Sequence, residues 1–220
     1  MASLKGAPHE VGEDFLCHEC ASLTSLECTP HKVGGRFVCS GCTSLTSLEG
    51  APHEVGKDFF CSGCTSLTSL KGAPQKVDGE FYCSRCTSLT SLEGAPKEVS
   101  RNFICNDCTS LTSLEGAPQK VGRNFHCNGC TSLTSLEGAP QNVRGDFNCN
   151  DTKITTNQKQ AYLKWLKTKQ KENYHEQIMP ESIAFICSIM RGNDDEAKAI
   201  LESIMRKKVA KRIKESLNFI

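Results

Sequence analysis

The first two thirds of the chain repeat every 22 residues, and this period constrains the fold more than any other feature. A valine stands four residues before each marker phenylalanine, a cysteine stands two residues after it, and in six repeats a second cysteine follows three residues later. A period of about 20 to 50 residues is typical of solenoids, because one unit buries its apolar face only when a neighbour stacks on it. The marker phenylalanines are Phe15, Phe37, Phe59, Phe81, Phe103, Phe125 and Phe147.

The spacing within one repeat predicts its local structure. In F-x-C the phenylalanine and the cysteine are two residues apart, so they share one face of a strand while the residue between them points the other way. The segment E-G-A-P contains glycine before proline and is typical of a turn. We therefore expect each unit to hold one short strand, a bend at the cysteines, and an irregular return arm with two leucines, such as Leu67 and Leu70.

The pattern F-x-C-x-x-C-x-x-L resembles the cysteine form of the leucine-rich repeat over residues 3–155. The valine lies four rather than three residues before the phenylalanine, and one extra residue separates the second cysteine from the leucine. The resemblance implies an α/β repeat solenoid, right-handed and with a one-sided parallel sheet. The repeat sequence is also similar to the repeats of bacteriophage-encoded and bacterial proteins of this class, which generally have no assigned chemistry.

Charge divides the chain near residue 153. Residues 1–152 hold 12 Lys and Arg against 17 Asp and Glu, whereas residues 153–220 hold 14 against 8. We predict a solenoid of about seven coils over 1–155 and an all-α cap over 156–220, with helices over 158–170, 180–192 and 194–219 that cover the end of the solenoid. Thr156 or Asn157 is expected to cap the first helix.

The fifteen cysteines are open to three interpretations. No export signal is present at the amino terminus, which favours reduced thiols and a cytoplasmic protein. We favour two inward-facing ladders of buried thiols that bond weakly to the backbone. Zinc or iron–sulfur binding, for example at Cys61, Cys64, Cys83 and Cys86, is one alternative and redox catalysis is another. We expect no cofactor.

Three histidines and two further cysteines are also candidates for ligands or reactive groups. His9, His31 and His53 lie on the predicted return arm and are not placed as ligands of the cysteines. Cys28 replaces a turn glycine and is interpreted as a tolerated small side chain rather than a disulfide between two copies. Cys187 lies in an apolar stretch and is interpreted as part of a helix core.

The outward strand positions change from repeat to repeat and are the candidate binding surface. Five apolar or aromatic side chains in a row predict a stripe roughly 20 Å long on the concave sheet face, at about 4.8 Å per strand. A protein partner, a cover formed by the chain itself or by a second copy, and plain strand propensity are the alternatives. The candidate residues are Leu16, Val38, Phe60, Tyr82, Ile104 and His126, with Asp58, Glu80 and Asn102 among the polar residues that flank them.

The last predicted helix carries a secondary basic patch. A solvated helix face, an acidic partner and nucleic acid are the alternatives, and the absence of an aromatic nucleic-acid motif disfavours the last. The patch consists of Arg206, Lys207, Lys208, Lys211 and Arg212.

No enzyme motif is recognisable, so the sequence favours a non-enzymatic protein that binds a folded partner through the stripe. The phage resemblance makes a host defence protein, such as a CRISPR effector, a candidate target in the host cytoplasm. A self-assembling protein, with an uncapped amino-terminal edge that pairs with another copy, is an alternative. Metal or redox sensing by the cysteines and nucleic-acid binding are further alternatives, and no membrane partner is expected.

Overall fold

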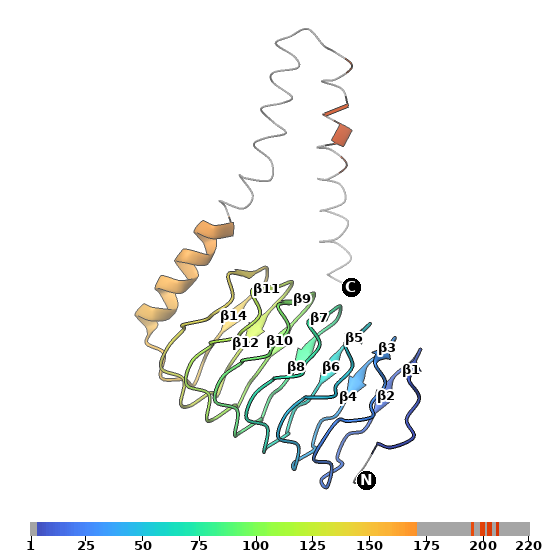
Figure 1. Cartoon of the computed structure of the whole chain (residues 1–220). Helices are drawn as coiled ribbons and strands as arrows, with labels where there is room; N and C mark the ends of the chain where they lie inside the picture. Colours follow the sequence, from blue (N-terminus) through green and yellow to red (C-terminus); the bar gives the residue numbers. More distant parts are fainter. Residues whose placement is uncertain (1–3, 171–194, 196–198, 201, 204–205, 207–220) are drawn as a thin grey trace. The chain divides into compact units, whose positions relative to one another are not determined.

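The computed structural model describes residues 4–170, 195, 199–200, 202–203 and 206, and it shows a parallel β-solenoid. Neighbouring coils stack side by side, and each coil contributes two strands of two residues (Figure 1). One sheet has the order β1-β3-β5-β7-β9-β11-β13 and the other the order β14-β12-β10-β8-β6-β4-β2. The first sheet consists of β1 (Glu10–Val11), β3 (Lys32–Val33), β5 (Glu54–Val55), β7 (Lys76–Val77), β9 (Glu98–Val99), β11 (Lys120–Val121) and β13 (Asn142–Val143). The second consists of β2 (Phe15–Leu16), β4 (Phe37–Val38), β6 (Phe59–Phe60), β8 (Phe81–Tyr82), β10 (Phe103–Ile104), β12 (Phe125–His126) and β14 (Phe147–Asn148).

The predicted repeat solenoid with a helical cap is confirmed, but the number of sheets differs from the sequence-based expectation. One sheet was expected and two are present, because the valine forms its own strand instead of continuing the strand of the phenylalanine. Three residues, such as those at 12–14, separate the two strands in every coil. This second strand also accounts for the valine lying four residues before the phenylalanine.

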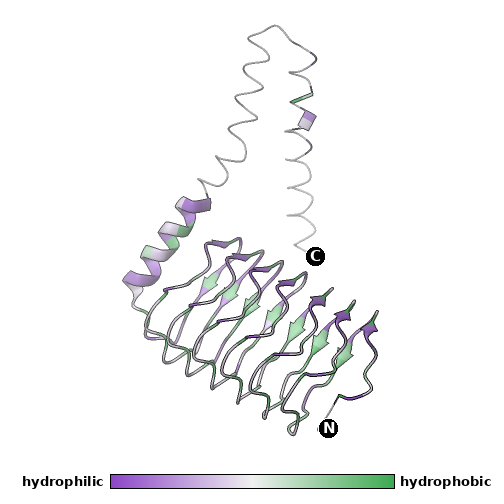
Figure 2. Ribbon diagram, in the orientation of Figure 1, coloured by the Kyte–Doolittle hydropathy of each residue, from purple (hydrophilic) through white to green (hydrophobic). Residues whose placement is uncertain are grey.

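The core consists of columns of identical side chains, because each coil pairs with the next in a register of 22 residues. The phenylalanines from Phe37 to Phe125 are fully buried, and their rings stack with centroids 5.0 to 5.3 Å apart. The leucines of the return arm and the cysteines form parallel buried columns beside them. Figure 2 shows apolar colour on the strands of the second sheet, whereas the loops carry both polar and apolar colour.

Left-handed backbone conformations make the two tight bends of each coil. At the C-x-x-C bend, the residue before the second cysteine has a positive φ, whether it is Gly41 at 74° or Arg85 at 59°. At the E-G-A-P turn, Gly94 has a φ of 88°, and a Cβ added there would lie 2.6 Å from the carbonyl carbon of Leu70. At Gly94 the bend therefore needs glycine for its close contact with the preceding coil as well as for its conformation.

A helix beginning at residue 156 covers the last coil and is described as far as residue 170. The ring of Tyr162 lies 4.6 Å from that of Phe147, and its hydroxyl donates a hydrogen bond of 2.7 Å to the carbonyl of Pro140. Contacts group the chain into two units, Met1–Leu166 and Lys167–Ile220, so this part of the helix belongs with the solenoid.

Thr155 caps this helix, one residue earlier than the predicted Thr156 or Asn157. Its Oγ1 accepts a hydrogen bond from the backbone N–H of Gln158 at 3.3 Å, while Gln158 Oε1 accepts one from the N–H of Thr155 at 2.9 Å. This is a reciprocal capping box between Thr155 and Gln158. Thr156 has Lys159 three residues later and so cannot form this pair, whereas Asn157, which Gln160 follows at that spacing, lies inside the helix. The predicted helix over 180–192 lies outside the described residues, while the described residues of the third are helical.

Candidate protein-binding surface

The outward residues of the second sheet form one continuous row, which we name the strand stripe: Leu16, Val38, Phe60, Tyr82, Ile104, His126 and Asn148. Exposure varies along it. Leu16 is 55% exposed, the middle of the row is half-buried, and Ile104 is only 8% exposed. Ile104 pairs with the larger Tyr82 and His126 in the neighbouring coils, and these side chains flank it on both sides. The apolar surface open to a partner is therefore concentrated between Leu16 and Tyr82.

Two aromatic rings form the centre of the strand stripe. Phe60 and Tyr82 stack with centroids 4.9 Å apart and planes inclined by 13°. The Tyr82 hydroxyl donates a hydrogen bond of 2.7 Å to Glu80 Oε2, and Asn102 Nδ2 donates one of 2.5 Å to Glu80 Oε1. Burial, together with the neighbouring carboxylate of Glu80, raises the pKa of Tyr82 to about 12. The hydrogen bond to Glu80 orients the Tyr82 ring, and Phe60 stacks on that ring.

The polar column just before the strand stripe mainly holds the coils together. In several coils a carboxylate or amide oxygen accepts the backbone N–H of the residue 22 positions later. Asp58 Oδ1 binds the N–H of Glu80 at 2.8 Å, and Asn102 Oδ1 binds the N–H of Asn124 at 3.0 Å. These oxygens are consequently already engaged, and Glu80 is bonded to two side chains. The apolar residues of the strand stripe are therefore bordered by polar groups that are already hydrogen-bonded.

A second polar column, beyond the first cysteine, repeats this arrangement in the later coils. Asn106 Oδ1 accepts the N–H of Asn128 at 2.9 Å, and Asn128 Oδ1 accepts the N–H of Asn150 at 2.8 Å. Ser84 Oγ does the same for the N–H of Asn106 at 3.2 Å. Side-chain ladders thus run along both sides of the strand stripe and reinforce the parallel sheet.

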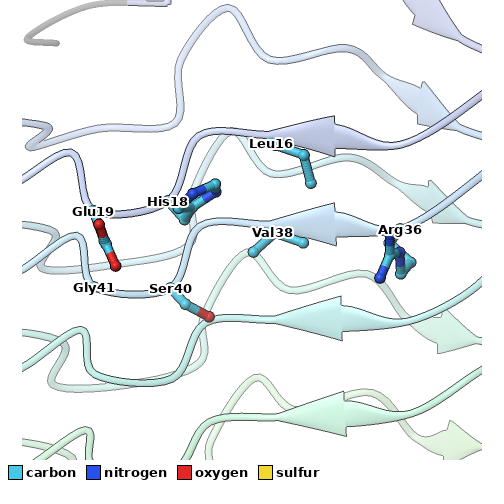
Figure 3. Close-up of a pocket in the computed structure, with 7 residues that line it drawn as sticks. All are labelled: Leu16, His18, Glu19, Arg36, Val38, Ser40 and Gly41. Atoms are coloured by element: carbon cyan, nitrogen blue, oxygen red, sulfur yellow. The ribbon is translucent and has the colours of Figure 1, made fainter.

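A shallow hollow of about 420 Å³ lies at the amino-terminal end of the strand stripe. Leu16 and Val38 provide its apolar part, while His18 and Ser40 lie along one side of it and Arg36 at the other (Figure 3). Arg36 is fixed by two hydrogen bonds to Asp14 Oδ2, of 2.6 and 2.9 Å, which lower the pKa of the Asp14 carboxyl. The hollow therefore places an exposed leucine near a guanidinium that Asp14 orients.

The cysteine ladders contact the backbone, as the sequence predicts, and all their members are buried except the half-buried Cys20. Cys64 Sγ donates to the carbonyl of Cys39 and Cys86 Sγ to that of Cys61, each at 3.2 Å, and the same contact recurs in neighbouring coils. Burial raises the pKa of the Cys17 thiol to about 12. Among the residues that the structure describes, no three His, Cys, Asp or Glu side chains are placed to hold one metal ion.

The histidines at the start of the first sheet form a column whose contacts the sequence reasoning missed. His9, His31 and His53 lie outside the strands, at the end of the return arm and directly before β1, β3 and β5. The ring centroids of His9 and His31 lie 4.4 Å apart, and those of His31 and His53 lie 5.8 Å apart. The sequence does contain the information that indicates this column, because the three histidines are spaced by one period of 22 residues.

The basic patch lies almost entirely outside the described residues. Only Arg206 is described; it is exposed and forms an ion pair of 3.7 Å with Glu202, one helical turn earlier. The remaining residues of the patch, Lys207, Lys208, Lys211 and Arg212, and the buried cysteine predicted at Cys187 are not described.

Comparisons of the chain with protein-family models, with curated proteins and with solved structures find no match. Within the described part of the chain, no helix has the length and apolar character needed to cross a membrane.

Proposed function

We propose that this chain is a non-enzymatic protein-interaction module that binds a folded partner through the strand stripe. The observation that carries the proposal is the apolar row on the second sheet, with Leu16 exposed at one end and the stacked Phe60 and Tyr82 in the middle. Exposed apolar side chains bordered by polar groups are common at protein interfaces, and aromatic anchors contribute much of the binding energy. The leucine-rich-repeat resemblance agrees with this use but does not identify a partner.

The similarity of the repeat sequence to repeats of phage-encoded proteins suggests a class of target. We suggest a host protein, including a defence factor such as a CRISPR effector, in the cytoplasm of the infected cell. Free thiols at every described cysteine agree with a reducing compartment. Self-assembly is the second candidate, since Phe15 and Leu16 on the first coil remain partly or largely exposed.

The test compares two triple variants in pull-downs from host lysate. Leu16→Lys/Phe60→Lys/Tyr82→Lys changes the strand stripe. The control, Thr46→Lys/Thr90→Lys/Thr112→Lys, adds the same charge on the return arm, where these threonines are exposed. Ile104 is left unchanged because it is buried, and its substitution would perturb folding.

We expect the parent protein and the return-arm variant to capture the same protein, and the stripe variant to lose it. The captured protein must then bind the purified parent directly. Equal capture by both variants, with circular dichroism showing that both fold, would refute binding through the stripe. Light scattering of the parent protein separates self-assembly from binding to another protein.

A further inference from the structure

A column of three imidazoles lies away from the strand stripe, at the beginning of the first sheet. His9, His31 and His53 are all exposed, and they occupy the same position in three consecutive coils. The ring centroids of His9 and His31 are 4.4 Å apart with planes inclined by 46°, and those of His31 and His53 are 5.8 Å apart and nearly parallel. Later coils carry Gln75, Lys97, Gln119 and Gln141 in this column.

Hydrogen bonds hold the backbone of the three histidines in register. The N–H of His31 donates to the carbonyl of His9 at 2.8 Å, and the N–H of His53 donates to the carbonyl of His31 at 3.0 Å. The strands that follow at once, β1, β3 and β5, are paired in parallel register. Only side-chain rotation is therefore needed to turn two ring nitrogens toward one point.

The separation of the first pair matches the geometry of two imidazoles bound side by side to one metal ion. A metal about 2.1 Å from a ring nitrogen lies about 3.2 Å from the ring centre. Two rings at right angles about that metal then have centres about 4.5 Å apart, and two rings at a tetrahedral angle about 5.2 Å. The 4.4 Å between His9 and His31 fits the right-angled arrangement, whereas the 5.8 Å between His31 and His53 exceeds both.

We propose that this histidine column binds one divalent late transition-metal ion, Ni²⁺ or Cu²⁺, chiefly between His9 and His31. Imidazole suits these ions, and right-angled coordination by nitrogen and oxygen is the arrangement they prefer. No third protein ligand converges on this point among the described residues, so water completes the coordination. The nearest cation in the sequence, Lys32, is engaged by Glu54 at 2.7 Å, which offsets its repulsion of the metal.

The experiment titrates the full chain with Ni²⁺ by calorimetry, in a Cys28→Gly background that removes the exposed thiol. His31→Gln removes the residue shared by both ring pairs, and glutamine already occupies the same column at Gln75. His18→Gln is the matched control, because His18 is exposed but lies outside the column. Circular dichroism verifies that each variant folds like the parent.

We expect one Ni²⁺ per chain, a loss of affinity of at least about tenfold in His31→Gln, and no change in His18→Gln. His9→Gln should weaken binding more than His53→Gln, because it removes the pair with the better spacing. Parent-like affinity in His31→Gln, an equal loss in His18→Gln, or no Ni²⁺ binding by the parent would overturn the proposal.

Discussion

Gly94→Ala and Gly6→Ala test whether close contact between coils, rather than backbone conformation alone, demands glycine at the E-G-A-P turn. The two glycines have the same left-handed backbone, with φ values of 88° and 89°. Their surroundings differ. A Cβ on Gly6 would meet nothing within 4 Å, whereas a Cβ on Gly94 would lie 2.5 Å from Lys71 Cα and 2.6 Å from the carbonyl carbon of Leu70.

The magnitudes follow from these two environments. Both variants bear the cost of a left-handed alanine, about 1–2 kcal/mol, which is partly offset by the lower entropy of the unfolded chain. Gly94→Ala must in addition move the backbone of the preceding coil, at an overpacking cost of about 1–3 kcal/mol. The same movement strains the adjacent hydrogen bond of 2.9 Å from the N–H of Leu70 to the carbonyl of Glu93, which contributes about 1 kcal/mol.

We therefore expect a loss of about 1 kcal/mol in Gly6→Ala and of about 3–5 kcal/mol in Gly94→Ala. Urea unfolding followed by circular dichroism measures both, with the midpoint of the parent as reference. At a slope of about 1–3 kcal/mol per molar urea, the two midpoints should differ by roughly 1 M or more. Equal midpoints for the two variants would show that contact between coils plays no part and would refute the reasoning.

Three further perturbations have outcomes that follow from the structure. Cys28 is exposed and has a φ of 69°, in a column that glycine otherwise occupies. Because a left-handed backbone is strained in any residue but glycine, Cys28→Gly should raise the urea midpoint by the equivalent of about 1 kcal/mol. A lower midpoint would contradict this. Tyr162→Phe removes the hydrogen bond to Pro140 and should cost about 1 kcal/mol without altering the circular dichroism spectrum; an unchanged midpoint would show that the bond contributes nothing. Burial raises the pKa of the Cys17 thiol from 9.0 to about 12, so its stabilising effect is complete below pH 9 and is lost as the pH rises toward 12. Urea midpoints measured from pH 8 upward should therefore fall above pH 9, and less steeply in Cys17→Ala, while parallel curves for the two proteins would contradict that assignment.

Most of the features that sequence reasoning predicted correctly depend on the period. Phe59 and Phe81 are one period apart, so they stack on each other if every unit folds in the same way. Such stacking is expected because a single coil cannot bury its phenylalanine alone. The same logic placed both cysteine ladders inside and predicted their weak bonds to the backbone. The helical cap followed from the change in composition after the last repeat.

The candidate site was less predictable, because exposure depends on the sizes of neighbours that are 22 residues away. Ile104 is apolar and outward-facing by its spacing, yet it is almost buried in a row that includes Tyr82 and His126. Asp58 and Asn102 carry polar atoms that a partner could use, but their oxygens accept backbone N–H groups of the next coil.

The sequence by itself therefore determined the period, the inward columns and the identity of the outward row. Only the tertiary structure decided that each coil has two strands rather than one, since a run of E-V or K-V two residues long carries no strand signal until neighbouring coils pair with it. It also decided that His9 and His31 come within 4.4 Å of each other. Local spacing determines which way a side chain points, whereas stacking of the coils determines which groups it meets and how much of it remains exposed.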